Sequence, residues 1–136
     1  MNPKRVLVVD DNVVILKVLS MKLRSAGYEV LLAEDGAAAV SHARQAKPDI
    51  ILLDISFPPD VGGGVAWDGF LILGWLRRLE EAKNTPVIVI SGDHTAETMK
   101  RARAAGVVDF CPKPLDFPRL ISAIERALSE AVPSPA

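Results

Sequence analysis

Five short apolar runs, rich in β-branched residues, recur along this chain, and their recurrence constrains the fold more than any other feature. They lie at residues 6–9, 30–33, 50–53, 87–90 and, more weakly, 107–111. Each run is too short for a helix and too apolar for a strand with one face in water. The runs therefore predict strands of a sheet that is buried on both faces.

Longer stretches of helical period separate these runs, with apolar residues recurring at spacings of three and four. The expected helices span residues 12–26, 36–45, 68–81, 95–105 and about 117–131. Strict alternation of strand and helix predicts a parallel sheet, because a crossover between parallel strands uses a helix to return. We expect an α/β, doubly wound fold with five helices on the two faces of a five-stranded sheet.

Length and charge narrow the class of protein further. The 136 residues fit one domain, which we expect over residues 1–131 with residues 132–136 as a tail or the start of a linker. Sixteen basic and seventeen acidic residues give a net charge of −1, which argues against direct binding to nucleic acid or to a membrane. Cys111 is the single cysteine, so no internal disulfide can form, and we expect a cytoplasmic protein.

Polar side chains follow four of the predicted strands at their carboxyl ends, where such sheets bind ligands. They are Asp10 and Asp11, Asp54, Ser91 and Lys113. Three carboxylates at one edge repel each other unless a hard divalent cation such as Mg²⁺ holds them together. A hydroxyl and an ammonium group beside them suit the oxygens of a phosphoryl group.

Each of these residues alone has an ordinary structural explanation. Asp11 or Asn12 can cap the following helix, Ser91 can belong to a turn, and a single lysine is usually a solvated surface residue. Five such residues at neighbouring strand ends are harder to explain in this way. The sequence therefore predicts a site for phosphoryl chemistry.

The residues that surround these positions resemble the receiver domain of two-component response regulators. The matching stretches are residues 6–12, 33–36, 47–54, 85–92 and 105–114, so the resemblance runs essentially from end to end. It implies a flavodoxin-like sheet with the strand order 2-1-3-4-5. Whether the chain is a single-domain regulator or a receiver excised from a larger protein stays open.

The resemblance also implies a role for each site residue. Asp54 would be the phospho-acceptor, and Asp10, Asp11, Asp54 and the backbone carbonyl of Ser56 would bind Mg²⁺, with Mn²⁺ as a substitute. Ser91 and Lys113 would bind the phosphoryl group. Ser91 would also form a switch with Phe110, whose ring rotates inward, and the bond between Lys113 and Pro114 would be cis.

The implied function is signalling, without turnover of a separate substrate. A histidine kinase or a histidine phosphotransfer domain would donate the phosphoryl group, and the surface of the fourth helix, fifth strand and fifth helix would change. Its partner would be an effector protein, a covalently linked output domain or, as a phosphorylation-dependent homodimer, a second copy. The expected output surface comprises Met99, Lys100, Arg103, Asp109, Asp116 and Arg119, for which a solvated face is the simpler explanation.

Two further features remain open on the sequence. Val14, Val18 and Met21 form an apolar stripe on the first helix, which suits either a docking face for the phosphoryl donor or ordinary half-burial. The chain also departs from the family pattern after Pro58. The segment from Pro59 to Trp67 makes the loop there about seven residues longer, in a region where short loops are normal.

The extension is a candidate lid near the acceptor. Gly62, Gly63 and Gly64 favour mobility, and Trp67 could close over the site, anchor a partner or, most simply, plug onto the third helix.

Two other functions fit parts of this pattern. An aspartyl-phosphate hydrolase of the haloacid dehalogenase type needs a second Asp two residues after its nucleophile, where this chain has Ser56. A degenerate receiver that acts only as a binding module would not need the complete set of site residues. His42 and His94 have no partner that suggests a triad or a zinc site, and Cys111 is expected to be a small core hydrophobe.

Overall fold

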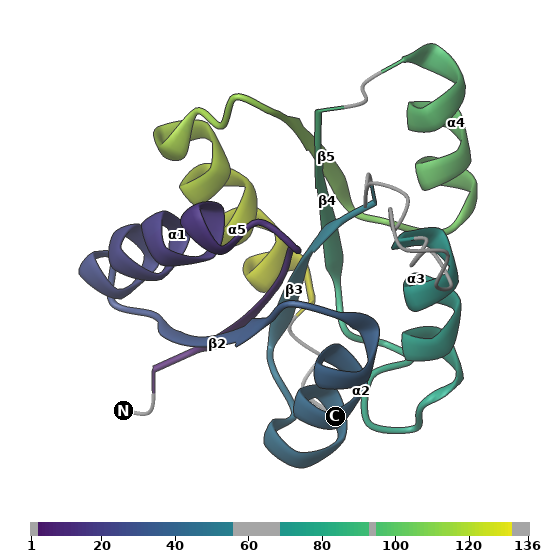
Figure 1. The fold of residues 1–136 in the computed structure, drawn as a ribbon, viewed down its shortest axis with the longest axis horizontal. Coiled ribbons are helices and arrows are strands. Elements are labelled where there is room, and N and C mark those ends of the chain that lie inside the picture. The colour runs from purple at the N-terminus through teal and green to yellow at the C-terminus, as the bar shows by residue number, and fades with distance from the viewer. Residues whose placement is uncertain (1–2, 56–68, 93–94, 132–136) are drawn as a thin grey trace.

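The computed structural model describes residues 3–55, 69–92 and 95–131, apart from the side chains of the last two. A parallel five-stranded sheet forms its centre, in the order β2-β1-β3-β4-β5 (Figure 1). The strands are β1 (Arg5–Val9), β2 (Glu29–Ala33), β3 (Ile50–Asp54), β4 (Val87–Ser91) and β5 (Asp109–Pro112). The predicted fold class and strand order are confirmed.

Helices cover both faces of this sheet, with α1 and α5 on one side and α2, α3 and α4 on the other (Figure 1). They are α1 (Val13–Ser25), α2 (Gly36–Ala46), α3 (Gly69–Arg78), α4 (Ala96–Ala104) and α5 (Phe117–Ala131). Within the described parts of the chain, no helix is long and apolar enough to cross a membrane.

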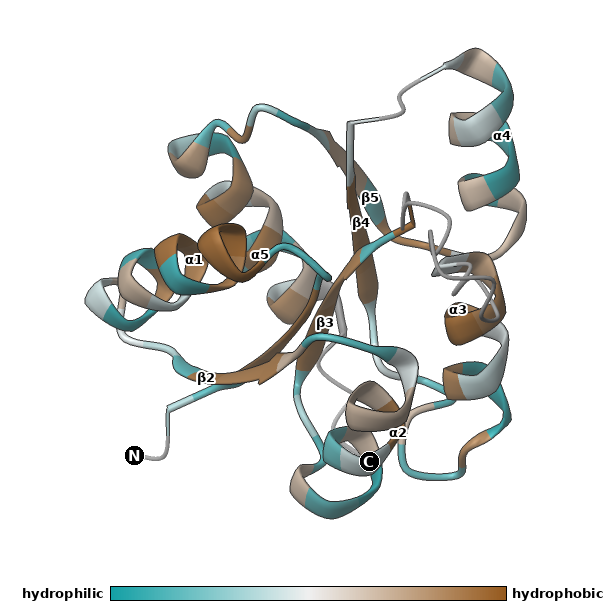
Figure 2. Ribbon diagram, in the orientation of Figure 1, coloured by the Kyte–Doolittle hydropathy of each residue, from teal (hydrophilic) through white to brown (hydrophobic). Residues whose placement is uncertain are grey.

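The alternation of side chains along the strands divides the core into two layers. Val6, Val8 and Leu52 face α1 and α5, whereas Leu7 and Leu53 face the other three helices. Every residue of β3 and β4 is buried, and Figure 2 shows the central strands as the most hydrophobic part of the fold. The prediction of strands buried on both faces is therefore confirmed for β3 and β4.

The edge strands depart from that interpretation. Leu31 and Leu32 in β2 are only half-buried, because β2 is an edge strand, paired on one side with β1. At the opposite edge, β5 begins at Asp109, so the run predicted from residue 107 starts two residues too early, and Val108 is 50% exposed.

The predicted end of the third helix is also wrong. α3 ends at Arg78, and residues 79–84 form turns instead of continuing the helix to residue 81. The guanidinium of Arg77 donates hydrogen bonds to the carbonyl oxygens of Thr85, at 2.6 Å, and Lys83, at 3.5 Å. These bonds hold the chain in its path toward β4 and favour the turns over another helical turn.

Candidate functional site

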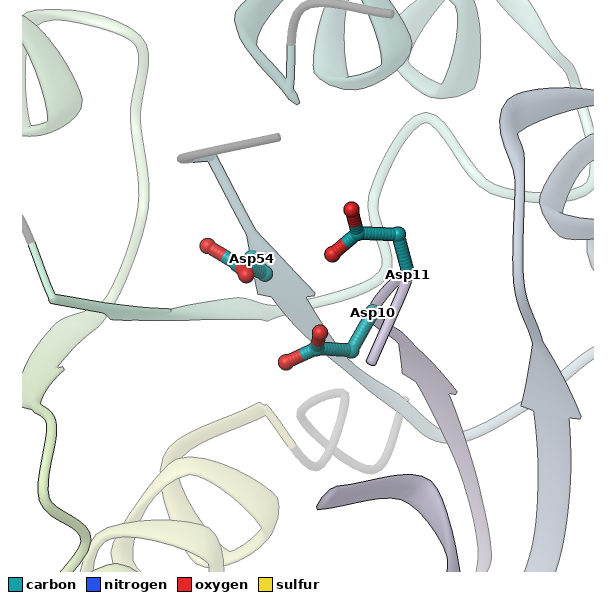
Figure 3. Close-up of side chains that lie close together, drawn as sticks. All are labelled: Asp10, Asp11 and Asp54. Atoms are coloured by element: carbon teal, nitrogen blue, oxygen red, sulfur yellow. The ribbon is translucent and has the colours of Figure 1, made fainter. Parts of the chain in front are cut away.

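The carboxylates predicted to meet do lie together at the carboxyl edge of the sheet. β1 and β3 are paired with Val9 opposite Leu53, so Asp10 and Asp11 come level with Asp54. One carboxylate oxygen from each of the three residues lies within 4.8 Å of those of the other two. Figure 3 shows Asp10 and Asp11, from the end of β1, extending toward the same space as Asp54 at the end of β3.

The chain after β1 assigns these residues different local tasks. Asn12, not Asp11, is the N-cap of α1, because its side-chain oxygen accepts hydrogen bonds from the backbone N–H groups of Val14 and Ile15 at 2.9 and 3.3 Å. Asp10 is fully buried and accepts a bond of 2.9 Å from the N–H of Asn12. Because Asn12 is the N-cap, capping does not explain the place of the exposed Asp11 in the cluster.

Lys113 joins the two buried carboxylates. Its Nζ donates to Oδ2 of Asp10 at 2.8 Å and to Oδ2 of Asp54 at 2.9 Å. Its backbone N–H donates to the carbonyl oxygen of Ser91 at 2.9 Å, which fixes the segment that carries the lysine onto β4. The following bond to Pro114 is cis.

Two opposing effects act on the pKa of Lys113. Burial lowers it, but the hydrogen bonds and the negative charges of Asp10 and Asp54 raise it further, so the net pKa lies above that of an ordinary lysine. The side chain is therefore an ammonium ion at neutral pH. Its single positive charge faces three carboxylates, which leaves two negative charges at this edge of the sheet.

The donor set fits a hard divalent cation. Carboxylate oxygens are preferred ligands of Mg²⁺, and the excess negative charge of the cluster favours binding of such a cation. Asp10, Asp11 and Asp54 could therefore bind a metal ion. Ser56, whose carbonyl was expected to contribute, lies outside the described residues.

Ser91 and Phe110 are placed on the strands beside this cluster. Ser91, at the end of β4, is fully buried. Phe110 is only 9% exposed and packs in the core layer formed with α2, α3 and α4. The expected inward rotation of Phe110 thus begins from a ring that is already inside, because β5 directs this side chain into the core.

The predicted output surface is only partly a solvated face. Lys100 and Arg103 are exposed, whereas Met99 is half-buried and packs against the core. Asp109 accepts a hydrogen bond of 2.8 Å from the N–H of Phe110. Asp116 directly precedes α5 and Arg119 lies in its first turn, and Oδ1 of Asp116 accepts a bond of 3.2 Å from the N–H of Arg119.

The apolar stripe on α1 is exposed. Val14, Val18 and Met21 are 68%, 37% and 72% exposed, so half-burial does not describe this stripe as a whole. Val14 and Val18 line an apolar groove of about 310 Å³ between α1 and the segment after Lys113, with Leu115 and Phe117 on its other wall. Figure 2 shows the first turn of α1 as hydrophobic.

The remaining candidates divide into two groups. Cys111 is buried, as a core residue should be, and His42 is half-buried in α2. The other residues lie outside the described part of the chain: Pro58, Pro59, Gly62, Gly63, Gly64, Trp67 and His94.

The sequence did not predict one contact at the site, that of Gly69 with the end of β3. Gly69 opens α3 directly against the backbone of Asp54 and Ile55, and a Cβ at this position would lie 2.7 Å from the carbonyl oxygen of Asp54. The sequence signal was the Asp-Gly pair at residues 68–69, at the start of a predicted helix. Nothing local indicates that this glycine touches the end of β3.

Comparisons with known proteins agree with this architecture. The family model of the response regulator receiver domain matches residues 6–125. The polar-differentiation response regulator DivK of Brucella anthropi is 30% identical over 129 residues, which cover 95% of this chain and 99% of that protein.

Solved structures show the same fold. A CheY-like response regulator receiver domain protein from Methanospirillum hungatei superimposes with a TM-score of 0.83 at 25% identity, over 96% of this chain and 97% of that one. The chemotaxis response regulator CheY4 of Vibrio cholerae gives a TM-score of 0.80 at 28% identity, over 93% and 99%. Family model, relatives and fold agree, and the chain belongs to the response regulator receiver domains of two-component systems.

Proposed function

We propose that Asp54 accepts a phosphoryl group from a phosphohistidine of a histidine kinase or a histidine phosphotransfer domain. The observation that carries this proposal is that the ammonium of Lys113 bonds both Asp54 and Asp10, next to the exposed carboxylate of Asp11. A carboxylate oxygen of Asp54 attacks phosphorus, and the new P–O bond forms as the P–N bond breaks. The electron pair of that bond leaves with the imidazole, which departs neutral when its other nitrogen carries a proton.

Asp10, Asp11 and Asp54 would hold Mg²⁺ together with the backbone carbonyl of Ser56, and Mn²⁺ could replace it. Bound Mg²⁺ supplies stabilisation of negative charge on the phosphoryl oxygens. Lys113 is already 2.9 Å from an oxygen of Asp54, so its ammonium can donate to a phosphoryl group attached there. Ser91, at the end of the adjacent strand, would donate its hydroxyl to another phosphoryl oxygen.

Phosphorylation would then change the surface formed by α4, β5 and α5. In this proposal Ser91 moves toward the phosphoryl group and the packing around Phe110 rearranges. Because the ring is already buried, the change is a repacking within the core rather than a swing from solvent. An effector protein, a linked output domain or a second copy of the chain would bind the changed surface.

The exposed stripe of α1 would receive the phosphoryl donor. Val14 and Val18 line the groove that ends at Lys113, and the exposed Met21 continues the stripe along α1, so a donor seated there lies next to the acceptor cluster. The variant Met21→Glu should slow transfer from a phosphorylated histidine domain but leave phosphorylation by acetyl phosphate unchanged. Equal slowing of both reactions, or of neither, would contradict this assignment.

The wider role follows from these parts. Residues 1–131 would form a receiver that signals by binding and turns over no substrate other than its own phosphoryl group, followed by a tail or linker at 132–136. The candidate lid at Gly62, Gly63, Gly64 and Trp67 is a proposal from sequence alone. Cys111 is a free thiol, which suits a reducing compartment, and we place the protein in the cytoplasm.

Beryllofluoride, an analogue of the phosphoryl group, tests the acceptor directly. Fluorine NMR of the wild type should show bound beryllofluoride only when Mg²⁺ is present, and Asp54→Asn should show none. Asp35→Asn is the matched control, because Asp35 is the N-cap of α2 and Asn caps a helix equally well. Bound fluorine signals in Asp54→Asn, or none in the folded wild type, would overturn the proposal.

A further inference from the structure

We propose that the first turn of α3 links Asp54 to α4 through Gly69, Phe70 and Arg101, so that the chemical state of Asp54 sets how firmly α4 is held. This inference rests on the proposed function and adds a route for its regulation. The route leaves the acceptor strand β3 itself, whereas the expected switch of Ser91 and Phe110 lies on β4 and β5.

The first step is the close packing of Gly69 against the backbone of Asp54 and Ile55. A Cβ on Gly69 would lie 2.7 Å from the carbonyl oxygen of Asp54 and 2.9 Å from Cβ of Ile55, and closer still to Cα of Ile55. The start of α3 therefore touches the backbone from which the Asp54 side chain departs. Closely packed atoms transmit displacement, so a shift at the end of β3 moves the first turn of α3.

The second step joins α3 to α4. Phe70 follows Gly69, and the guanidinium carbon of Arg101 lies 4.0 Å from the centre of its ring, in cation–π geometry. Phe70 is half-buried and also packs against the core layer on this side of the sheet. The ring of Phe70 thus moves with α3, and it contacts both the core and the guanidinium of Arg101 in α4.

The third step is the weak attachment of α4. Of the residues in α4, all of which are described, Ala102 alone is buried and Met99 is half-buried against the core. α1, by comparison, buries three leucines. An element with so little buried apolar surface opens at low free-energy cost, so loss of one side-chain contact changes its stability measurably.

Phosphorylation of Asp54 would change the hydrogen bonds at the start of this link. Lys113 now bonds both Asp10 and Asp54, and a phosphoryl group on Asp54 replaces one of these acceptor oxygens with new ones. The Asp54 side chain and the end of β3 then change position, and Gly69 is displaced with them. The ring of Phe70 moves relative to Arg101, and α4 loosens.

Hydrogen exchange of the α4 amides, Ala96–Ala104, tests the link in the full chain. Mg²⁺ with beryllofluoride should speed exchange in wild-type α4. In Arg101→Ala, exchange should already be about two- to fivefold faster without beryllofluoride, the effect expected of one exposed cation–π contact. The further change on adding beryllofluoride should be less than half that of the wild type.

Arg78→Ala is the matched control, because it removes the same charge from an exposed site in α3 and should behave as the wild type. If Arg101→Ala binds beryllofluoride and its α4 responds as fully as in the wild type, the link is overturned. The same holds if wild-type α4 does not respond although beryllofluoride binds. If the wild type binds no beryllofluoride, the proposed function fails first and this inference with it.

Gly69→Ala tests the other end of the link. The added methyl group must push α3 away from β3, so α4 exchange should rise without beryllofluoride. Gly74→Ala is its control, since a Cβ there meets nothing within 4 Å. Equal α4 exchange in the two variants would contradict the link, and Arg101→Ala decides the matter if Gly69→Ala does not fold.

Discussion

At the scale of single residues, the candidate site is an arrangement of unbalanced charge. Asp10 and Asp54 share one ammonium group, and Asp11 adds a carboxylate that no described hydrogen bond ties to Lys113. We expect repulsion among the three carboxylates to lower the stability of the metal-free fold and to raise its affinity for a cation. Sites of this kind trade stability for binding.

Asp11→Asn should separate these two effects. Without metal, loss of one negative charge relieves repulsion without breaking a bond to Lys113, so Tm should rise by roughly 1–3 °C. The rise of Tm produced by Mg²⁺ should shrink, because one ligand is weakened. Thermal unfolding in EDTA and across a Mg²⁺ series measures both, and a lower metal-free Tm with an unchanged Mg²⁺ response would contradict the charge argument.

Cys111 allows a test of burial at a single group. Burial raises the pKa of its thiol, the negative charge of Asp109 raises it further, and Arg119 offsets part of the shift. Folding therefore disfavours the thiolate, and stability from this group is present below the ordinary thiol pKa and is lost as pH rises through the raised one.

A disulfide reagent at pH 8 should consequently react with native Cys111 at least about a hundredfold more slowly than with the urea-unfolded chain. The thiol is only 3% exposed, which adds a steric barrier to the chemical one. Reaction of the native protein at the rate of the unfolded chain would show that β5 opens readily.

At the scale of elements, two glycines should respond in opposite directions to the same substitution. Gly27 ends α1 with a φ of +95°, where an L side chain is strained, so Gly27→Ala should cost about 1 kcal/mol in the free energy of unfolding. Gly74 lies inside α3 with open space around it, so Gly74→Ala should gain roughly 0.5–1 kcal/mol. Urea unfolding measures both, and shifts of the same sign would contradict this account.

The sequence predicts the elements well where the pattern is local. The buried runs and the helical periods indicate all ten elements within the described residues, because pleat and helix periods are properties of neighbouring residues. The end of α3 is not predicted, since it depends on a hydrogen bond between Arg77, in the last turn of the helix, and Thr85, seven residues beyond its end. The half-burial of Leu31 and Leu32 depends on where β2 lies in the sheet, which their own run does not encode.

At the scale of the whole molecule, strict alternation predicts the class of fold but leaves the strand order open. The order came from the family resemblance, and it is what places Asp10, Asp11 and Asp54 side by side on β1 and β3. Grouping of the acidic residues was predictable because parallel strands end at one edge of the sheet. The burial of Phe110 and the contacts of Gly69 and Arg101 were not, because they arise from packing between distant elements.

The central claim is that Asp54 accepts a phosphoryl group with the help of Mg²⁺, and intact mass after incubation with acetyl phosphate tests it most directly. The wild type should gain the mass of one phosphoryl group in Mg²⁺ and none in EDTA, and Asp54→Ala should gain none in either. A gain in Asp54→Ala equal to that of the wild type would place the acceptor elsewhere. No gain in the folded wild type, together with no binding of beryllofluoride, would contradict the account as a whole.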